Sequence, residues 1–239
     1  MQLKSFQKYT CEFIGTFCLV FFAAGAVMVN SLIPGIGVIG SGIISGSIIT
    51  IVIFTFGQIS GAHVNPALSL AAAWLGKLDW RLVPGYMISQ MAGSAAAGFS
   101  LLWLIGDHAS MGANLPNEAL GVTGEIALVI EIFLSFLLMW VVCGTAYHSQ
   151  GNMELAAIPI GVTVGIEVML MGPYAGAAMN PARAFGPYLA FGDLTHYWIY
   201  VVGPIAGMFL GALVLSLIHI SEPTRPLYIS YAVFCLKKK

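Results

Sequence analysis

The chain has 239 residues, of which 59% are hydrophobic and only 8% charged, and its formal net charge is −1. A soluble domain carries about 25% charged residues, so this composition excludes an ordinary water-soluble protein and indicates a chain whose solvent is lipid. The near-zero net charge argues against nucleic acid as a partner.

Six apolar runs are long enough for membrane-spanning helices, because a helix needs roughly 20 apolar residues to cross the hydrocarbon core. Only helices and closed barrels satisfy their backbone hydrogen bonds in lipid, and the runs lack strand-like alternation. Small residues along most of the runs would let neighbouring helices approach closely. In chain order the predicted helices cover residues 10–33, 36–56, 82–105, 125–147, 155–172 and 197–218.

Two shorter segments, 65–75 and 180–190, interrupt this series. Each allows a helix of about 11 residues, or roughly 16 Å, which is half the thickness of a membrane. We expect re-entrant half-helices that end near the midplane, where irregular backbone must line a cavity or be buried in protein. The alternative is that both segments are surface loops. Each segment begins with the same triplet, Asn65-Pro66-Ala67 in GAHVNPALSL and Asn180-Pro181-Ala182 in GAAMNPARAFGP.

Landmarks of the first half of the chain recur in the second half at nearly constant spacing. The two triplets are 115 residues apart, Glu12 in CEFIGTF matches Glu131 in IEIFLSF at 119, and QMAG matches PIAG at 114. This spacing predicts a duplication, with a first repeat at 1–110 and a second at 111–218. Since each repeat has three spans, the second is inverted in the membrane, and transport proteins often place their site between such repeats.

The paired triplets predict a pore with a barrier to protons. Asn is a favoured N-cap and Pro suits the first helical position, so each triplet indicates the start of a helix. By the inverted symmetry both starts meet near the bilayer centre, each bearing roughly half a positive charge. Each Asn would cap backbone donors with its oxygen and donate from its NH₂ group into the lumen. A water between two such donors loses its hydrogen bonds along the file, and the positive ends repel hydronium.

Five ionisable residues near these segments are candidates for the site. Arg183 lies three residues after the second Asn, on the same helix face, and is expected at the narrow outer mouth; a salt bridge or a snorkelling side chain is the alternative. Glu12 and Glu131 are expected to accept hydrogen bonds from the re-entrant loops, with a proton relay as the alternative. His63 either packs within its loop or gates the cytoplasmic mouth. Glu167 has no role that the sequence assigns.

Basic residues near the spans indicate the orientation of the chain. Lys4 and Lys8 precede the first span, Lys77 and Arg81 lie between the second and third, and the stretch 106–124 has no Lys or Arg. We therefore expect a multi-pass protein of the cell membrane, plasma or inner, with a cytoplasmic N-terminus.

The C-terminal segment, about 215–239, differs from the rest of the chain. Glu222, Pro223, Arg225 and Pro226 arrive where the last span should still be finishing, and ISYAVFCLKKK back-translates into what resembles a sequencing-library adapter running into poly-A. We interpret 215–239 as a non-native tail and exclude it from functional reasoning. The alternative is a basic cytoplasmic tail that meets anionic lipid.

The motifs SGAHVNPA and GAAMNPARAFGP, together with six spans, resemble those of the major intrinsic protein (aquaporin) family over about 1–218. The resemblance implies an aquaporin-like all-α membrane fold of six transmembrane helices and two re-entrant half-helices. It also implies a homotetramer in which each subunit has its own pore, and a four-residue constriction in that pore. Counting along the family pattern places the constriction at Ser45, Val168, Ala177 and Arg183.

The constriction positions bear on the solute. Strict water channels resemble one another in having Phe and His at the first two positions, where this chain has Ser45 and Val168. Without both rings the constriction should be wider and pass water plus small neutral solutes such as glycerol, urea or undissociated metalloid acids. Two features keep the choice open. Ala184 stands where glycerol facilitators resemble one another in carrying Asp, and Tyr200-Val201 looks more like the nodulin-like branch.

A passive channel is the leading interpretation, and its expected partners are the bilayer, water and small neutral solutes. A proton-coupled secondary transporter of a small polar solute and a structural membrane protein with the same fold are the alternatives. The spans contain no nucleophile–base pair and no metal-ligand spacing, so we expect no enzyme activity, no metal and no cofactor.

Overall fold

The computed structural model describes residues 5–147 and 153–220, and this part of the chain is helical, without strands. Six of its helices are long and apolar enough to span a membrane, which confirms the predicted spans. Residues 221–239, most of the predicted non-native tail, lie outside the described residues. The spanning helices are α1 (Ser5–Leu32), α2 (Gly37–Ser60), α4 (Val83–Ile105), α5 (Gly124–Val142), which the π-helical turn η3 (Cys143–Tyr147) continues, α6 (Met153–Ala175) and α8 (Ile199–Ile220).

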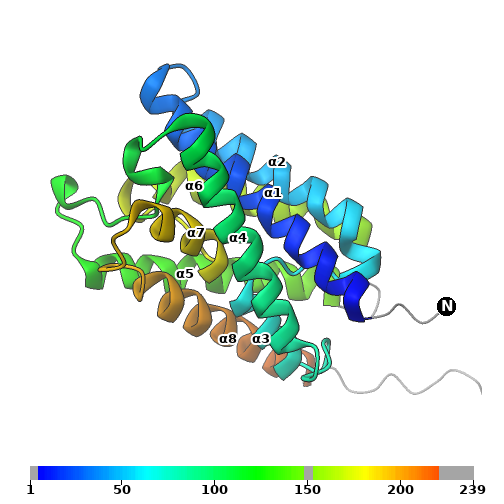
Figure 1. The fold of residues 1–239 in the computed structure, drawn as a ribbon. Helices are drawn as coiled ribbons and strands as arrows, with labels where there is room; N and C mark the ends of the chain where they lie inside the picture. The colour runs from blue at the N-terminus through cyan, green and yellow to red at the C-terminus, as the bar shows by residue number, and fades with distance from the viewer. Residues whose placement is uncertain (1–4, 148–152, 221–239) are drawn as a thin grey trace, which may run out of the picture.

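Two short helices lie between the spans and confirm the predicted half-helices. α3 covers Pro66–Trp74, where the sequence predicts 65–75, and α7 covers Pro181–Phe191, where it predicts 180–190. In Figure 1, α3 lies towards the right-hand end of the bundle and α7 towards the left-hand end. The two half-helices therefore enter from opposite ends, and the loops before them meet inside.

The spans of each half pack through a glycine that has no room for a side chain. In the first half, an added Cβ on Gly93 of α4 would overlap the carbonyl oxygen of Phe13 in α1. In the second half, a Cβ on Gly207 of α8 would overlap the carbonyl oxygen of Ile132 in α5. Membrane helices that approach this closely gain van der Waals contact that lipid cannot replace.

The two halves join where α2 crosses α6. A Cβ added to Gly46 would collide with the carbonyl oxygen of Gly161, and one added to Gly161 would collide with the carbonyl oxygen of Gly46. These two glycines are 115 residues apart, the same spacing as the two triplets. The contact is therefore reciprocal, as expected of two equivalent helices that meet on a local two-fold axis.

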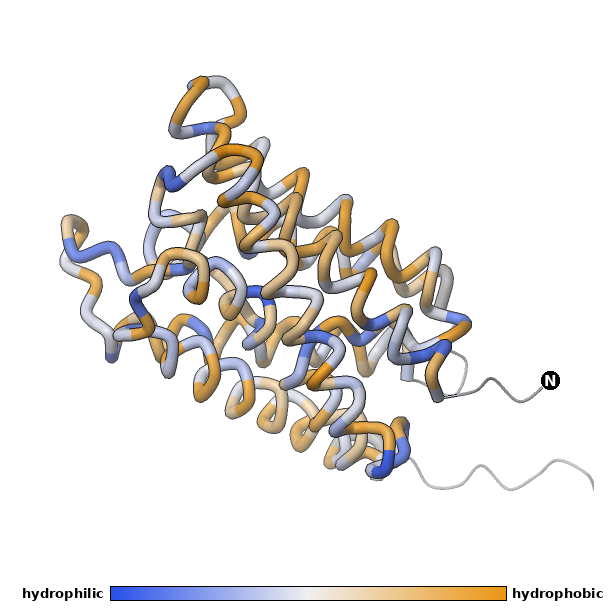
Figure 2. Tube along the Cα trace, viewed as in Figure 1, coloured by the Kyte–Doolittle hydropathy of each residue, from blue (hydrophilic) through white to orange (hydrophobic). Residues whose placement is uncertain are grey.

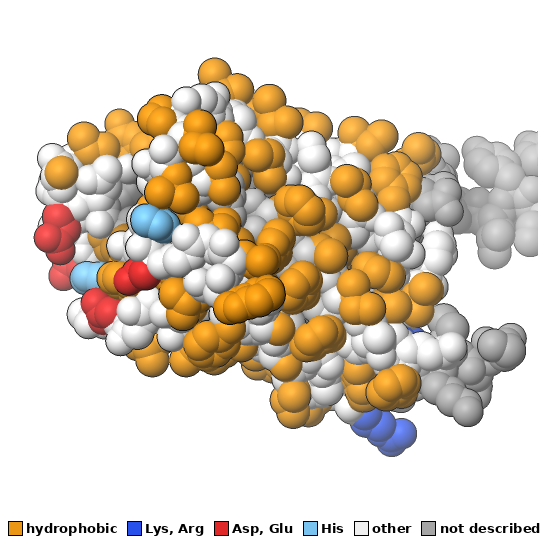
Figure 3. Space-filling view, turned by 45° about the horizontal axis from the view of Figure 1, so that its top comes forward, with side chains coloured by type: hydrophobic (Ala, Val, Ile, Leu, Met, Phe, Trp, Pro, Cys, Tyr) orange, Lys and Arg blue, Asp and Glu red, His pale blue; other side chains and the backbone are white. Residues whose placement is uncertain are grey.

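Polar residues gather at the two ends and inside, and apolar ones along the sides. Figure 2 shows this distribution along the chain. Large apolar side chains of the spanning helices, such as those of Trp103, Val129 and Leu170, are exposed. In Figure 3 acidic side chains lie at the left-hand end and Lys or Arg at the right-hand end. Figure 1 places the start of α1 and the connection 75–82 at the right, and the connection 106–123 at the left.

Candidate functional site

Both half-helices begin with the same capping geometry. Asn65 and Asn180 have extended backbones, with φ of −154° and −157°, and a Pro follows each at the start of its helix. The side-chain oxygen of Asn65 accepts hydrogen bonds from the backbone of Ala67 at 2.9 Å and Leu68 at 3.3 Å. That of Asn180 accepts equivalent bonds from the two residues at the same places in α7, Ala182 at 2.9 Å and Arg183 at 3.2 Å. Each side chain thus satisfies backbone donors that a helix start leaves free.

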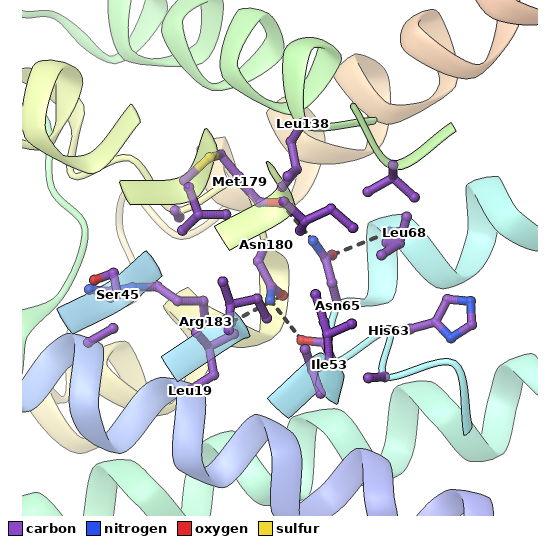
Figure 4. Close-up of a pocket in the computed structure, with 18 of the residues that line it drawn as sticks. Leu19, Ser45, Ile53, His63, Asn65, Leu68, Leu138, Met179, Asn180 and Arg183 are labelled. Carbon is purple, nitrogen blue, oxygen red and sulfur yellow. Dashed lines mark hydrogen bonds between the residues drawn. The ribbon is translucent and has the colours of Figure 1, made fainter. Parts of the chain in front are cut away.

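The two carboxamides lie side by side in the middle of the bundle, and each donates to the loop that precedes the other (Figure 4). Asn65 Nδ2 donates to the carbonyl oxygen of Met179 at 2.9 Å, and Asn180 Nδ2 donates to the carbonyl oxygen of Val64 at 2.8 Å. From the sequence alone, the NH₂ group of each Asn is expected to donate into the lumen only. In the structure one N–H of each group holds the facing loop, because that loop's carbonyl lies within reach, and one N–H is left for the lumen.

The two re-entrant loops contain non-glycine residues in the left-handed region of backbone conformation. In the first loop Ala62 and Val64 have φ of +45° and +43°; in the second, Ala177 and Met179 have φ of +48° and +53°. Such residues cost about 1–3 kcal/mol each and persist only where their surroundings hold them. The strain thus falls at matching positions, directly before each capping Asn.

Two fully buried carboxylates hold these loops. Glu12 accepts hydrogen bonds from the backbone N–H groups of His63 at 3.0 Å and Val64 at 2.6 Å. Glu131 accepts from those of Ala178 at 2.8 Å and Met179 at 2.7 Å. The environments differ, because Glu12 also accepts from the side chains of two residues that the sequence reasoning missed, Ser60 at 2.7 Å and Gln90 at 2.8 Å.

A cavity of about 70 Å³ runs past the two carboxamides. At roughly 10–15 Å³ per water, it has room for about five molecules. Ser45, Ala177 and Arg183 line this cavity. A second, wider hollow of about 440 Å³ also reaches Arg183 and is lined by Val168. The structure therefore brings three of the four predicted constriction positions to one cavity and places Val168 in the wider hollow, which we call the outer hollow because the connection 106–123 lines it.

The guanidinium of Arg183 lies where the cavity and the outer hollow meet. Figure 4 shows Arg183 and Ser45 on one side of the paired Asn residues and His63 on the other. Arg183 Nη1 donates to the carbonyl oxygen of Gly112 at 3.1 Å and to Asn114 Oδ1 at 2.6 Å. The sequence suggested an acidic partner for Arg183, and Asn114 was not predicted. It is one of several polar residues in a polar connection, so nothing in the sequence distinguishes it.

His63 lies at the other end of the cavity. Its Nε2 is 3.3 Å from the hydroxyl of Tyr147, which also lines the cavity, and its Nδ1 is 4.0 Å from Glu12 Oε1. His63 therefore packs in its loop and also borders the cavity, at the end opposite Arg183. Glu167 is buried on α6, and neither of its carboxyl oxygens has a hydrogen-bond partner in the described part of the chain.

Comparison with known proteins agrees with this geometry. The family model of the major intrinsic proteins matches residues 1–215. Aquaporin NIP1-1 of Zea mays is 39% identical over 219 residues, which cover 90% of this chain and 76% of that protein. Nodulin-26 of Glycine max is 35% identical over 223 residues, which cover 90% of this chain and 79% of that protein.

Among solved structures, the aquaglyceroporin from Plasmodium falciparum superposes with a TM-score of 0.79 at 21% sequence identity, covering 91% of this chain and 100% of that chain. At this identity the likeness concerns the fold alone. The match of the family model over nearly the whole described region, together with relatives above 30% identity, shows that this membrane protein belongs to the major intrinsic protein family.

Proposed function

We propose that the protein is a passive membrane channel for water and small neutral solutes that excludes protons and ions. The observation that carries this proposal is the pair of half-helix starts whose Asn side chains cross-bond beside a narrow cavity. The family supports it, because the relatives are named aquaporins. The protein is a channel and not an enzyme.

The geometry supplies the proton barrier. Each half-helix start carries roughly half a positive charge, and both point at the centre of the cavity. The free N–H of each Asn donates to the oxygen of a passing water, so that water cannot also accept a hydrogen bond from its neighbour in the file. A proton cannot then hop through the centre, and a cation meets two positive ends.

The pore roles follow the two triplets. Asn65 and Asn180 are the central donors, and the Pro and Ala that follow each Asn form the first turn behind it: Pro66, Ala67, Pro181 and Ala182. Glu12 and Glu131 support the strained loops, because a buried carboxylate that accepts two backbone N–H groups fixes their direction. His63 borders the inner end of the pore.

We place the constriction at Ser45, Ala177 and Arg183, which line the narrow cavity, with Val168 lining the wider hollow that Arg183 also reaches. Three of these side chains are small or aliphatic, so the passage beside Arg183 is wide enough for more than water. Arg183 donates to hydroxyl or carbonyl oxygens of a passing solute and repels cations. The solutes that suit such a passage are glycerol, urea and undissociated metalloid acids.

We further propose that the chain is an inverted repeat with halves at 1–110 and 111–218, and that 215–239 is not native. The reciprocal contact of Gly46 with Gly161 supports the two-fold relation. The N-terminus is cytoplasmic and the membrane is the cell membrane, in keeping with the basic end of Figure 3. The channel is a homotetramer, as the family resemblance implies, and its mass in detergent tests this.

Stopped-flow swelling of liposomes tests the channel against its alternatives. If the protein is a channel, vesicles that contain it shrink or swell faster than empty liposomes, and the solute flux does not saturate at ordinary solute concentrations. A proton-coupled transporter would saturate and respond to a proton gradient. A structural protein would leave the permeability of empty vesicles unchanged.

A further inference from the structure

The connection between α4 and α5 contains a turn in which every residue is left-handed. In η1 (Ala109–Gly112) the φ values are +49°, +49°, +57° and +66°, and three of the four residues are not glycine. The turn is pressed against α1, where a Cβ on Gly112 would lie 2.5 Å from the carbonyl oxygen of Ala24, and Met111 is fully buried. A conformation that L-residues avoid is thus held by packing, which points to a use for the atoms it presents.

Asn114 follows this turn and is only 1% exposed. Its Nδ2 donates to the carbonyl oxygen of Gly176 at 2.7 Å, and its own carbonyl oxygen accepts from the hydroxyl of Tyr188 at 2.6 Å. Its Oδ1 accepts the bond from Arg183. A single buried residue therefore connects the second re-entrant loop, the half-helix α7 and the guanidinium.

This arrangement fixes which donors of Arg183 face the pore. A guanidinium has five N–H groups, of which two belong to Nη1. The carbonyl of Gly112 and the side chain of Asn114 take both of them. The N–H groups of Nε and Nη2 remain for the cavity and the outer hollow, both of which Arg183 lines.

We propose that Asn114 is a positioning residue that sets the selectivity of the constriction by holding Arg183 and the carbonyl of Gly176 in one fixed arrangement. This inference rests on the proposed channel function. A held guanidinium meets each solute with its donors already in place and leaves the lumen open. A released guanidinium moves through the lumen and must be ordered again at each passage, which obstructs a larger solute more than water.

The test compares two asparagines of the same connection. Asn114→Leu removes both side-chain bonds and keeps the number and branching of the side chain's heavy atoms. Asn117→Leu is the matched control, because Asn117 lines the same hollow but its amide donates to the carbonyl oxygen of Pro173 at 2.8 Å, and the side-chain bonds of Arg183 go to Gly112 and Asn114 instead. In liposomes, Asn114→Leu should lower the ratio of glycerol to water permeability by about tenfold, the lower end of the loss expected when a hydrogen bond to a charged group is removed. Asn117→Leu should leave this ratio unchanged.

An epistasis measurement separates positioning from general loosening of the fold. In an Arg183→Ala background, Asn114→Leu should change the ratio no further, because its effect acts through the guanidinium. Asn114→Ser is a milder second variant, whose side chain is too short to reach Arg183, and it should shift the ratio in the same direction. Equal shifts in both leucine variants, or a full shift without the Arg183 guanidinium, would overturn the inference.

The outcome also distinguishes this inference from the channel proposal. If liposomes that contain the unsubstituted protein swell no faster than empty liposomes, the channel function is wrong, and the positioning role with it. A parent that conducts, with the same ratio in Asn114→Leu and Asn114→Ser, defeats the positioning role alone.

Discussion

The two re-entrant segments, 61–74 and 176–191, share one construction and differ in how they are held. Each segment consists of a loop that contains left-handed residues and a half-helix that an Asn caps, and each Asn donates a hydrogen bond to the facing loop. The differences lie around them. At the third position after the Asn the first segment has Leu68 and the second has Arg183.

The supports of the two segments also differ. In the described structure Glu12 accepts four hydrogen bonds and Glu131 accepts two. Among the described residues, only the second segment is hydrogen-bonded to the connection 106–123, through Asn114 and the carbonyl of Gly112. The comparison separates two tasks. The symmetric part suits proton exclusion, and the asymmetric part suits the choice of solute.

The largest expected effect concerns the stability of the two loops. Glutamine replaces one carboxylate oxygen by an NH₂ group, so Glu12→Gln leaves two buried donors unmet and Glu131→Gln leaves one. At about 1–3 kcal/mol per unmet buried donor, Glu12→Gln should lower the free energy of unfolding by about 2–6 kcal/mol and Glu131→Gln by about half of that. SDS unfolding in mixed micelles measures both, and a larger loss for Glu131→Gln would contradict the difference.

The symmetry of the proton barrier can be broken at either Asn. Aspartate still caps a helix, but it has no N–H for the facing carbonyl and it brings a negative charge to the centre of the path. Asn65→Asp and Asn180→Asp should each raise the proton leak about tenfold, the effect of ~1.4 kcal/mol on a barrier. A pH-sensitive dye inside liposomes reports the leak. A leak in only one of the two variants would show that the barrier is not shared.

The third residue after each capping Asn differs between the two half-helices, Leu68 in α3 and Arg183 in α7. Arg183→Leu makes the second half-helix resemble the first, and it removes the positive charge between the cavity and the outer hollow. Potassium permeability should then rise several-fold, because the mouth has lost its repulsion of cations. Leu68→Met is the control at the equivalent place and should have no effect on potassium. Unchanged potassium exclusion in Arg183→Leu would assign the barrier to the half-helix starts alone.

The constriction gives the smallest expected effect. Ser45→Phe with Val168→His adds two rings beside Arg183 and should lower glycerol flux more than water flux. Ser45 lines the inner cavity and Val168 the wider outer hollow, so Ser45→Phe alone should account for most of the change. Swelling in glycerol and sucrose gradients compares the two fluxes. An equal drop in both would contradict the assignment of these positions.

Much of the fold could be predicted from local signals. Asn65 and Asn180 were recognisable because an N-cap and its Pro are adjacent in sequence, and Glu12 and Glu131 because the duplication repeats them. The predicted span 155–172 was short, since α6 reaches Ala175. That helix contains Pro173 in its last turn, where Pro lacks the N–H that would bond the carbonyl oxygen four residues earlier, so the sequence pattern predicts an earlier end.

The residues that hold the site could not be predicted in the same way. Asn114 bonds Gly176 and Arg183 across more than 60 residues of sequence, and nothing nearby distinguishes it from other polar loop residues. Gln90 offered a weak signal, as a polar side chain in an apolar run, but its partner Glu12 lies on another helix. Val168 was placed by counting alone, which cannot tell the two hollows apart. Nothing in the structure explains Glu167.

The central claim is that two facing carboxamides let water pass and stop protons. Purified protein in liposomes, loaded with a pH-sensitive dye and followed by light scattering, gives water and proton permeability from one preparation. We expect water permeability well above that of empty liposomes, with proton permeability equal to theirs. Proton flux that rises together with water flux, or water flux no greater than in empty liposomes, would contradict the claim.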